Sequence, residues 1–318
     1  MTPLSWLAGR VYFGRSSLRV AAAVAVAASV MIIVTGGVVR VTGSGLGCPT
    51  WPSCTGEGLA PTPEMGIHGA IEFGNRMLTG VLCLAVGALI IIARCQNRPD
   101  RAVLRAAWLQ FWIVVLNAVV GGVTVLARLS PYIVAAHFIA AMLLLTAAVY
   151  TVELVGRGDR PDVAEVDRGL VVRSRWLVAS SAVLVLIGTA VTGSGVHAGD
   201  SSDVHRMPFD WLTMVILHAS SALATLILAV AIMRSAHRTG ASLVSSRTVV
   251  FVGLFLAQGL IGVLQALSVA EEVLVVLHML GAALIWSGAL RVAYATNPDL
   301  GKQLVNADMR ASKLRSKA

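Results

Sequence analysis

Apolar residues gather in long stretches that short polar and basic segments separate. Each stretch provides about 20 residues, which is enough for an α-helix to cross roughly 30 Å of hydrocarbon. The predicted membrane helices cover residues 20–39, 70–93, 107–127, 132–153, 176–196, 211–233, 248–267 and 273–294. The pattern therefore predicts an all-α integral membrane protein with eight transmembrane helices.

The composition supports a membrane protein and gives its expected orientation. Hydrophobic residues make up 57% of the 318 residues, charged residues only 13%, and the mean hydropathy is +0.80, which leaves too little polar surface for a soluble globule. The net charge of +9 does not indicate nucleic acid, because the basic residues fall in alternate loops. By the positive-inside rule both termini are expected in the cytoplasm of a bacterial cell, with the lipid bilayer as a partner. The basic segments are 10–19, 94–105, 157–175, 234–247 and 302–317.

The two halves of the chain repeat the same sequence features. The motif Thr-Gly-Ser-Gly occurs at residues 42–45 and again at 192–195, and each copy lies at the end of an odd-numbered apolar stretch. Four helices in each half make the repeat parallel, about an axis along the membrane normal, and predict two similar four-helix bundles. The predicted units are residues 1–153, a cytoplasmic linker 154–175, residues 176–296, and a basic cytoplasmic tail 297–318.

Polar residues recur near the outer end of every second predicted helix, and three of the four are histidines: Asn75, His137, His218 and His278. A lone histidine in a membrane helix is often a hydrogen-bonded core residue, but imidazole is also a common ligand of haem iron and is costly in hydrocarbon without a partner. The matched positions therefore indicate paired haem sites near the outer face.

The two predicted sites differ in coordination. Ligation by both His218 and His278 gives a six-coordinate, low-spin haem suited to electron transfer. Asn75 is a poor iron ligand, so His137 alone is expected to hold a five-coordinate haem in the first half, unless His68 supplies a sixth ligand. An open coordination position can take water or dioxygen, which assigns the reaction to the first half.

A carboxylate at membrane depth indicates a functional site, and Glu72 is such a residue. The alternative is an ion pair with Arg76, four residues later on the same helix face. The two interpretations are compatible, since a positioned carboxylate can stabilise developing positive charge or accept a proton. Arg76 would then hold either a haem propionate or the carboxylate itself.

Cys48 and Cys54 flank a proline-containing loop on the outer side, where a disulfide is expected. Either a structural clip or a redox-active pair fits this position. Within the helices, interhelical hydrogen bonding is expected for the polar residues Asn117, Gln258 and Gln265. Arg40 and Arg206, near the outer boundary, are further candidates to bind haem propionates.

Together, the sequence motifs of this chain resemble those of the haem A synthase family. The resemblance rests on Thr35-Gly36-Gly37, on the run from Arg40 to Cys54, on Ile71-Glu72 to Arg76, and on Leu277-His278-Met279. It implies oxidation of the C8 methyl group of haem O to a formyl group, which gives haem A for cytochrome aa3-type terminal oxidases. It also implies that His218 and His278 ligate a haem B cofactor, that His137 faces the substrate haem, that Glu72 is catalytic, and that Cys48 and Cys54 are the family's outer-loop pair.

One position departs from the family pattern. Asn75 stands where the usual form, Glu-x-x-His-Arg, has histidine, as expected for an actinobacterial-type variant. The departure affects the first site and leaves the second unchanged. Candidate partners are a haem O synthase, a quinol or other electron donor, and a second copy of the chain. Other functions that fit the residues are a di-haem electron-transfer cytochrome and, because parallel repeats are common there, a transporter.

Overall fold

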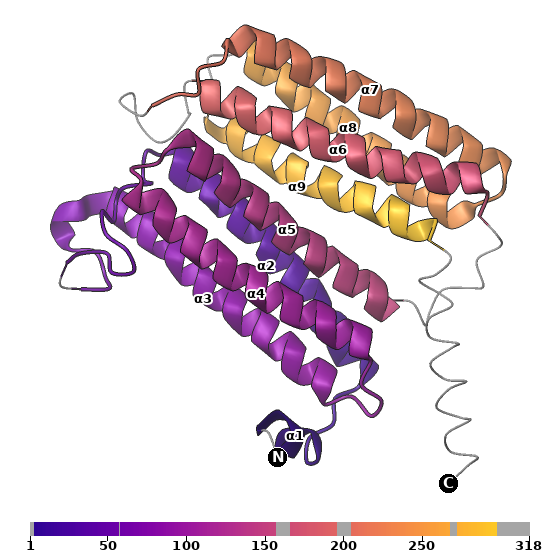
Figure 1. Ribbon diagram of the computed structural model, residues 1–318, viewed down its shortest axis with the longest axis horizontal. Coiled ribbons are helices and arrows are strands. Elements are labelled where there is room, and N and C mark those ends of the chain that lie inside the picture. The colour runs from indigo at the N-terminus through magenta and orange to yellow at the C-terminus, as the bar shows by residue number, and fades with distance from the viewer. Residues whose placement is uncertain (1–2, 57, 157–165, 196–204, 268–271, 298–318) are drawn as a thin grey trace.

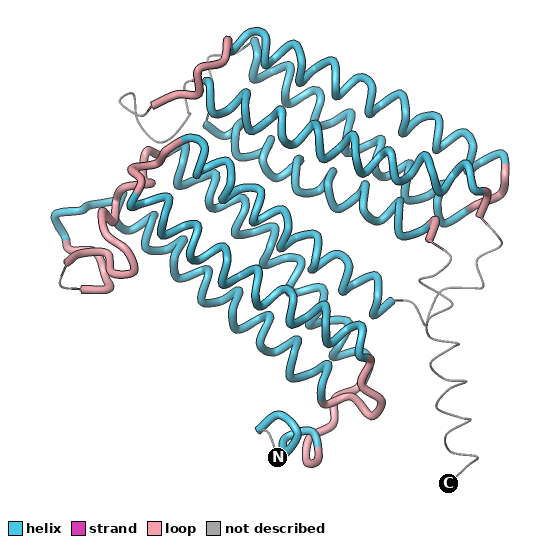
Figure 2. The backbone as a smooth tube through the Cα atoms, in the orientation of Figure 1, coloured by secondary structure: helices cyan, strands magenta, loops and turns pink. Residues whose placement is uncertain are grey.

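Each predicted apolar stretch corresponds to one long helix in the computed structural model, which describes residues 3–56, 58–156, 166–195, 205–267 and 272–297. The predicted stretches 107–127 and 176–196 extend slightly beyond the ends of their helices, at Leu126 and Ser194. The described residues form no strand (Figure 2). Besides the short helices α1 (Pro3–Ala8) and η1 (Pro63–Met65), eight helices are long and apolar enough to cross a membrane, which confirms the predicted fold class. They are α2 (Arg15–Val41), α3 (Gly66–Arg94), α4 (Arg101–Leu126), α5 (Pro131–Val155), α6 (Arg168–Ser194), α7 (Trp211–Arg238), α8 (Ser242–Leu267) and α9 (Glu272–Ala295).

Polar residues and one proline fix where several helices begin. The side chain of Asp100 accepts a hydrogen bond from the backbone N–H of Ala102 at 2.7 Å, at the start of α4. Asp210 caps α7 in the same way, accepting from the backbone N–H of Thr213 at 2.8 Å and from its hydroxyl at 2.7 Å, and these bonds lower the pKa of Asp210. Helix α5 begins at Pro131, where a missing N–H costs nothing.

A tight turn joins α4 to α5. Arg128 and Leu129 both have positive φ angles, 48° and 58°, which costs roughly 1–2 kcal/mol for a residue with a β-carbon. The backbone N–H of Leu129 donates to the carbonyl of Thr124 at 2.9 Å, and its side chain is only 5% exposed. Burial and hydrogen bonding offset the strain, and the turn brings α5 straight back along α4.

The helices form two similar groups of four that lie side by side (Figure 1). In the first bundle α2 contacts α3, α3 contacts α4, α4 contacts α5, and α5 contacts α2. In the second bundle α6 to α9 repeat this ring of neighbours. The bundles meet where α9 packs against α2 and α5, and where α5 meets α6. The shared arrangement is what a duplicated four-helix unit requires.

Both apolar cores lie toward the same end of the molecule. We call this the N-terminal end, where α2, α4, α6 and α8 begin, and the opposite end, with the 42–62 loop, the disulfide end. Fully or nearly fully buried apolar side chains fill the bundles near the N-terminal end. Examples are Leu89, Val114 and Leu154 in the first bundle and Leu170, Ile232 and Phe251 in the second. The predicted site residues lie in the other half of each bundle.

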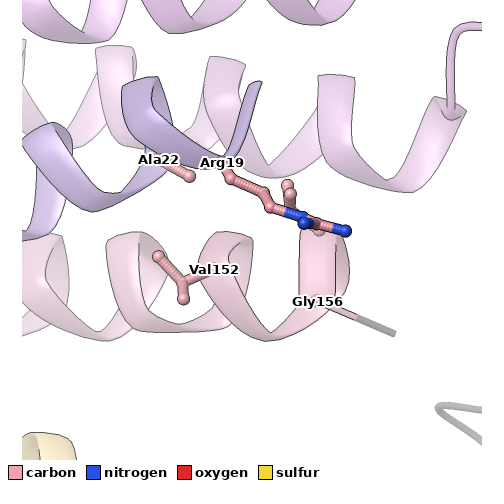
Figure 3. Close-up of a pocket in the computed structure, with 5 residues that line it drawn as sticks. Arg19, Ala22, Val152 and Gly156 are labelled. Carbon is pink, nitrogen blue, oxygen red and sulfur yellow. The ribbon is translucent and has the colours of Figure 1, made fainter. Parts of the chain in front are cut away.

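A cavity of about 270 Å³ opens between α2 and α5 at the N-terminal end (Figure 3). The guanidinium of Arg19 extends across it toward the end of α5. The cavity is lined by Arg19, Ala22, Val152, Val155 and Gly156. None of these residues was predicted to bind haem, and the cavity lies at the end of the bundle opposite Glu72 and the histidines.

Polar contacts join the two bundles near both ends: an ion-pair cluster near the N-terminal end and a hydrogen bond to a backbone carbonyl near the disulfide end. Glu153 of α5 is 2% exposed and accepts from Arg247 of α8 at 3.0 Å and from Arg291 of α9 at 3.3 Å. Near the disulfide end, Arg40 of α2 donates to the carbonyl of Thr192 in α6 at 3.3 Å. A buried carboxylate needs such partners, because hydrocarbon offers it no hydrogen bonds.

We predict that Glu153→Gln destabilises the protein by about 3 kcal/mol, the lower end of the range for a buried ion pair, because it leaves the partly buried guanidinium of Arg247, with 13% of its side chain exposed, without an opposite charge. Denaturant unfolding in detergent micelles measures the change. Glu272→Gln, at the exposed start of α9, is the matched control and should change stability by less than about 0.5 kcal/mol. Equal stability of the two variants would show that the ionic contact contributes nothing.

Candidate functional site

A buried carboxylate and a guanidinium pair near the start of α3. Glu72 is 5% exposed, and its Oε1 accepts from Arg76 Nε at 3.1 Å and also from Nη2. Its other oxygen, Oε2, accepts from the backbone N–H of Cys48 at 2.6 Å. The ion pair expected from the four-residue spacing is therefore present, and the outer loop adds a backbone donor to it.

Arg76 also fastens the outer loop to α3. Its Nη1 donates to the carbonyls of Thr50 at 3.0 Å and Ser53 at 3.1 Å, and its Nη2 donates to the carbonyl of Cys48 at 3.1 Å. A guanidinium has five N–H groups, and these three bonds with the two to Glu72 use all of them. Binding of a haem propionate by Arg76 stays a prediction and would require exchange of one of these partners.

The outer loop is closed by a disulfide between Cys48 and Cys54, which confirms the expected pairing. Both cysteines are 0% exposed. Between them, the indole of Trp51 rests on Gly122 of α4, where a β-carbon would overlap the ring. The loop thus covers the ends of both α3 and α4, and the disulfide lies inside the protein rather than at its surface.

The same loop makes a close contact with the first turn of α3. A β-carbon at Gly47 would overlap the backbone carbonyl of His68. The hydroxyl of Ser44, which is 0% exposed, lies 3.0 Å from Nδ1 of His68. His68 is therefore engaged with the loop in this structure, and its role as a sixth iron ligand stays a prediction.

Asn75 and His137 occupy different surroundings in the first bundle. The hydroxyl of Thr35 on α2 donates to Oδ1 of Asn75 at 2.8 Å, so the amide joins α3 to α2. His137 on α5 faces Gly121 on α4, where a β-carbon would lie 3.1 Å from the imidazole Cε1. The Nδ1 atom of His137 is buried and has no hydrogen-bond partner among the described residues. The first bundle therefore presents one unsatisfied imidazole.

The second bundle brings two imidazoles together. The ring centres of His218 on α7 and His278 on α9 are 6.4 Å apart, with their planes inclined at 53°. Each faces a glycine, Gly188 and Gly262. The buried Nδ1 of His278 lacks a hydrogen-bond partner among the described residues, whereas His218 interacts with the backbone of Leu184. A metal–imidazole nitrogen bond is about 2 Å long, so the spacing leaves room for one metal ion between the rings. The donor set therefore fits a haem held by two histidines.

Two polar residues that match in the repeat behave differently. The side chain of Gln258 in α8 donates to the backbone carbonyl of His278 in α9 at 2.8 Å, as expected for interhelical bonding. Asn117 differs from the expectation, because it donates to the carbonyl of Ile113 in its own helix at 2.9 Å. Its side chain is one methylene shorter. The sequence did not indicate the contacts that Thr35, Gly188 and Gly281 make with the site.

We predict that Gly47→Ala separates the loop from α3, because the new methyl group overlaps the carbonyl of His68. The expected cost is about 1–3 kcal/mol of stability, with faster reduction of the Cys48–Cys54 bond by dithiothreitol. Thermal unfolding and mass spectrometry after alkylation measure both effects. Gly56→Ala is the control, since nothing lies within 4 Å of a β-carbon there. Identical behaviour of the two variants would remove Gly47 from the loop contact.

Comparison with known proteins gives a family match over most of the chain. The COX15-CtaA family, described as cytochrome oxidase assembly protein, matches residues 19–290. The heme A synthase of Lysinibacillus sphaericus is 30% identical over 191 residues, which are 56% of this chain and 58% of the relative. The heme A synthase of Symbiobacterium thermophilum is 29% identical over 188 residues, which are 56% of this chain and 60% of the relative. The heme A synthase of Listeria monocytogenes is 29% identical over 183 residues, which are 57% of this chain and 59% of the relative. The chain thus spans little more than half the length of these curated relatives.

Proposed function

Because the chain belongs to the COX15-CtaA family of cytochrome oxidase assembly proteins, we propose that it is a haem A synthase, an oxidoreductase that converts the C8 methyl group of haem O to a formyl group. Heme A synthases from three bacteria match more than half of the chain. The structural observation that carries the proposal is the pair of imidazoles in the second bundle, His218 and His278, whose ring centres lie 6.4 Å apart.

We assign a resident haem B to the second bundle, held by His218 and His278. When bound, this haem supplies one-electron transfer, because two histidine ligands leave iron no open position. Gly188 and Gly262 leave space beside the two rings, so that the imidazoles can keep their orientation. Both histidines stand on helices that pack in one ring of neighbours, which fixes their separation without a flexible loop.

We assign the substrate haem O to the first bundle, beside His137. Glu72 is the catalytic residue in this proposal, and its carboxylate provides a fixed negative charge near the methyl group that loses electrons. Arg76 and the backbone N–H of Cys48 hold that carboxylate in place before the substrate binds, so little reorganisation is needed during the reaction. The disulfide-closed loop that carries Cys48 also shields this corner from water.

Asn75 defines the variant form of the first site. Since Thr35 bonds its side-chain oxygen, Asn75 is proposed to keep α2 and α3 in register while leaving iron coordination to His137. We also propose an actinobacterial-type variant, with both termini in the cytoplasm of a bacterial cell. The proposed partners are a haem O synthase that delivers the substrate, a quinol or other donor, and a second copy of the chain.

The central test is formation of haem A. We predict that cells able to make haem O but not haem A gain haem A, detected by mass spectrometry of extracted haems, when they express this chain. A protein that binds haem yet leaves haem O unchanged would instead be a di-haem electron-transfer cytochrome. Purified folded protein without haem absorbance would favour the transporter.

We predict that Glu72→Gln keeps the low-spin spectrum of the second bundle but lowers haem A formation by about 100-fold or more, because the amide carries no negative charge. Glu64→Gln, at an exposed position in η1, should leave both properties unchanged. Full activity of the Glu72 variant would remove the carboxylate from the mechanism.

We predict that Asn75→His moves the first site toward six-coordination, since it restores the imidazole of the common family pattern. Optical and electron paramagnetic resonance spectra of protein loaded with haem O should gain a second low-spin component. Thr35→Val provides the control, because it removes the hydrogen bond to Asn75 without adding a ligand. Unchanged spectra of the histidine variant would contradict the placement of substrate beside Asn75 and His137.

A further inference from the structure

The second bundle contains a contact that holds one proposed ligand by its backbone. Gln258 of α8 donates its side-chain N–H to the backbone carbonyl of His278. Gln258 is buried, with only 9% of its surface exposed. Gly281, one turn further along α9, makes this possible, because a β-carbon there would overlap the amide of Gln258. Helix α8 is therefore bonded to the same residue whose imidazole faces His218.

The first bundle has different residues at both matching positions. Asn117 stands twenty residues before His137, as Gln258 stands twenty before His278, and Ala140 stands three residues after His137, as Gly281 does after His278. The Asn117 amide donates within α4, to the carbonyl of Ile113. Ala140 is 5% exposed, so a methyl group is buried at the position that matches Gly281. The second bundle thus combines the longer side chain of glutamine with glycine, and the first bundle combines the shorter side chain of asparagine with alanine.

Because of this difference, α9 is hydrogen-bonded to α8 at the backbone of its proposed iron ligand His278. The Asn117 amide provides no such bond to the backbone of His137 on α5. Release of a haem requires its iron–imidazole bonds to break, and a hydrogen bond from a neighbouring helix to the ligand's own backbone opposes movement of that ligand away from the iron. Interhelical hydrogen bonds within membranes make modest but measurable contributions of this kind. The first bundle has the same helix packing, and its Asn117 amide bonds within α4 instead.

We propose that Gln258 and Gly281 are positioning residues that retain haem B in the second bundle, whereas Asn117 and Ala140 allow the first bundle to exchange its haem. The inference rests on the proposed function, in which one haem is a resident cofactor and the other is a substrate that must enter and leave. The chain then uses one duplicated fold for retention and for turnover, with the difference set by two residues in each bundle.

Exchanging the two pairs tests the proposal. The double variant Gln258→Asn with Gly281→Ala gives the second bundle the residues of the first. Full-length protein carrying His137→Ala, so that only the second bundle binds, is loaded with haem B and mixed with excess apomyoglobin, and release is followed by absorbance. We expect release to become about three- to tenfold faster, while the bound form keeps its low-spin spectrum.

The reciprocal variant, Asn117→Gln with Ala140→Gly, leaves the second bundle intact. In a His278→Ala background it should slow haem release from the first bundle by a similar factor. If the first double variant does not fold, the rate of haem release from this reciprocal variant still tests the proposal. Gln258→Met keeps the side-chain length and removes the donor, so it should release haem faster. Gln265→Asn on the same helix should not, because the Gln265 side chain, contrary to the expectation from the sequence, makes no hydrogen bond to another described residue.

The outcomes separate this inference from the proposed function. Unchanged release rates in Gln258→Met and in the reciprocal variant, with haem bound at both sites, would overturn the retention role and leave haem A synthesis untouched. A wild-type protein that takes up no haem would instead overturn the proposed function itself. Faster release together with loss of the low-spin spectrum would show a lost ligand rather than a loosened helix, and would also overturn the inference.

Discussion

Buried polar groups in these helices must find partners within the protein, because hydrocarbon supplies no hydrogen bonds. The two carboxylates that are buried in the described part of the chain obey this constraint. Glu153 is paired with two arginines from the other bundle, and Glu72 with Arg76 and a backbone N–H of the outer loop. Each pairing also builds structure, since the first joins the bundles and the second fastens the loop. The contacts that neutralise the two buried carboxylates therefore also hold parts of the structure together.

The imidazoles are the exceptions that point to function. Nδ1 of His137 and of His278 is buried without a hydrogen-bond partner among the described residues, although glycines leave space around the rings. A few other buried polar atoms, such as Ser181 Oγ, also lack a partner among the described residues. The imidazoles are distinguished by the pair His218 and His278, whose ring centres lie 6.4 Å apart, a spacing that leaves room for one metal ion.

The fold was largely predictable from the sequence, because helices in a membrane follow from apolar length alone. The Glu72–Arg76 pair and the Cys48–Cys54 disulfide were also predictable, since both depend on residues close in the sequence. The five bonds of Arg76 were not, because three go to loop carbonyls whose positions only the folded loop defines. Asn117 likewise differed from the expectation, because one methylene decides whether an amide reaches the next helix.

Duplication explains why the two ends of each bundle differ. Apolar packing near the N-terminal end is alike in both halves and has the same ring of helix neighbours, and neither Glu72 nor the histidines take part in it. The residues near the disulfide end are then free to diverge, and they do: Asn75 and Asn117 in the first bundle match His218 and Gln258 in the second. Since a change at this end leaves the distant core intact, one bundle can keep a cofactor while its copy becomes a site of reaction.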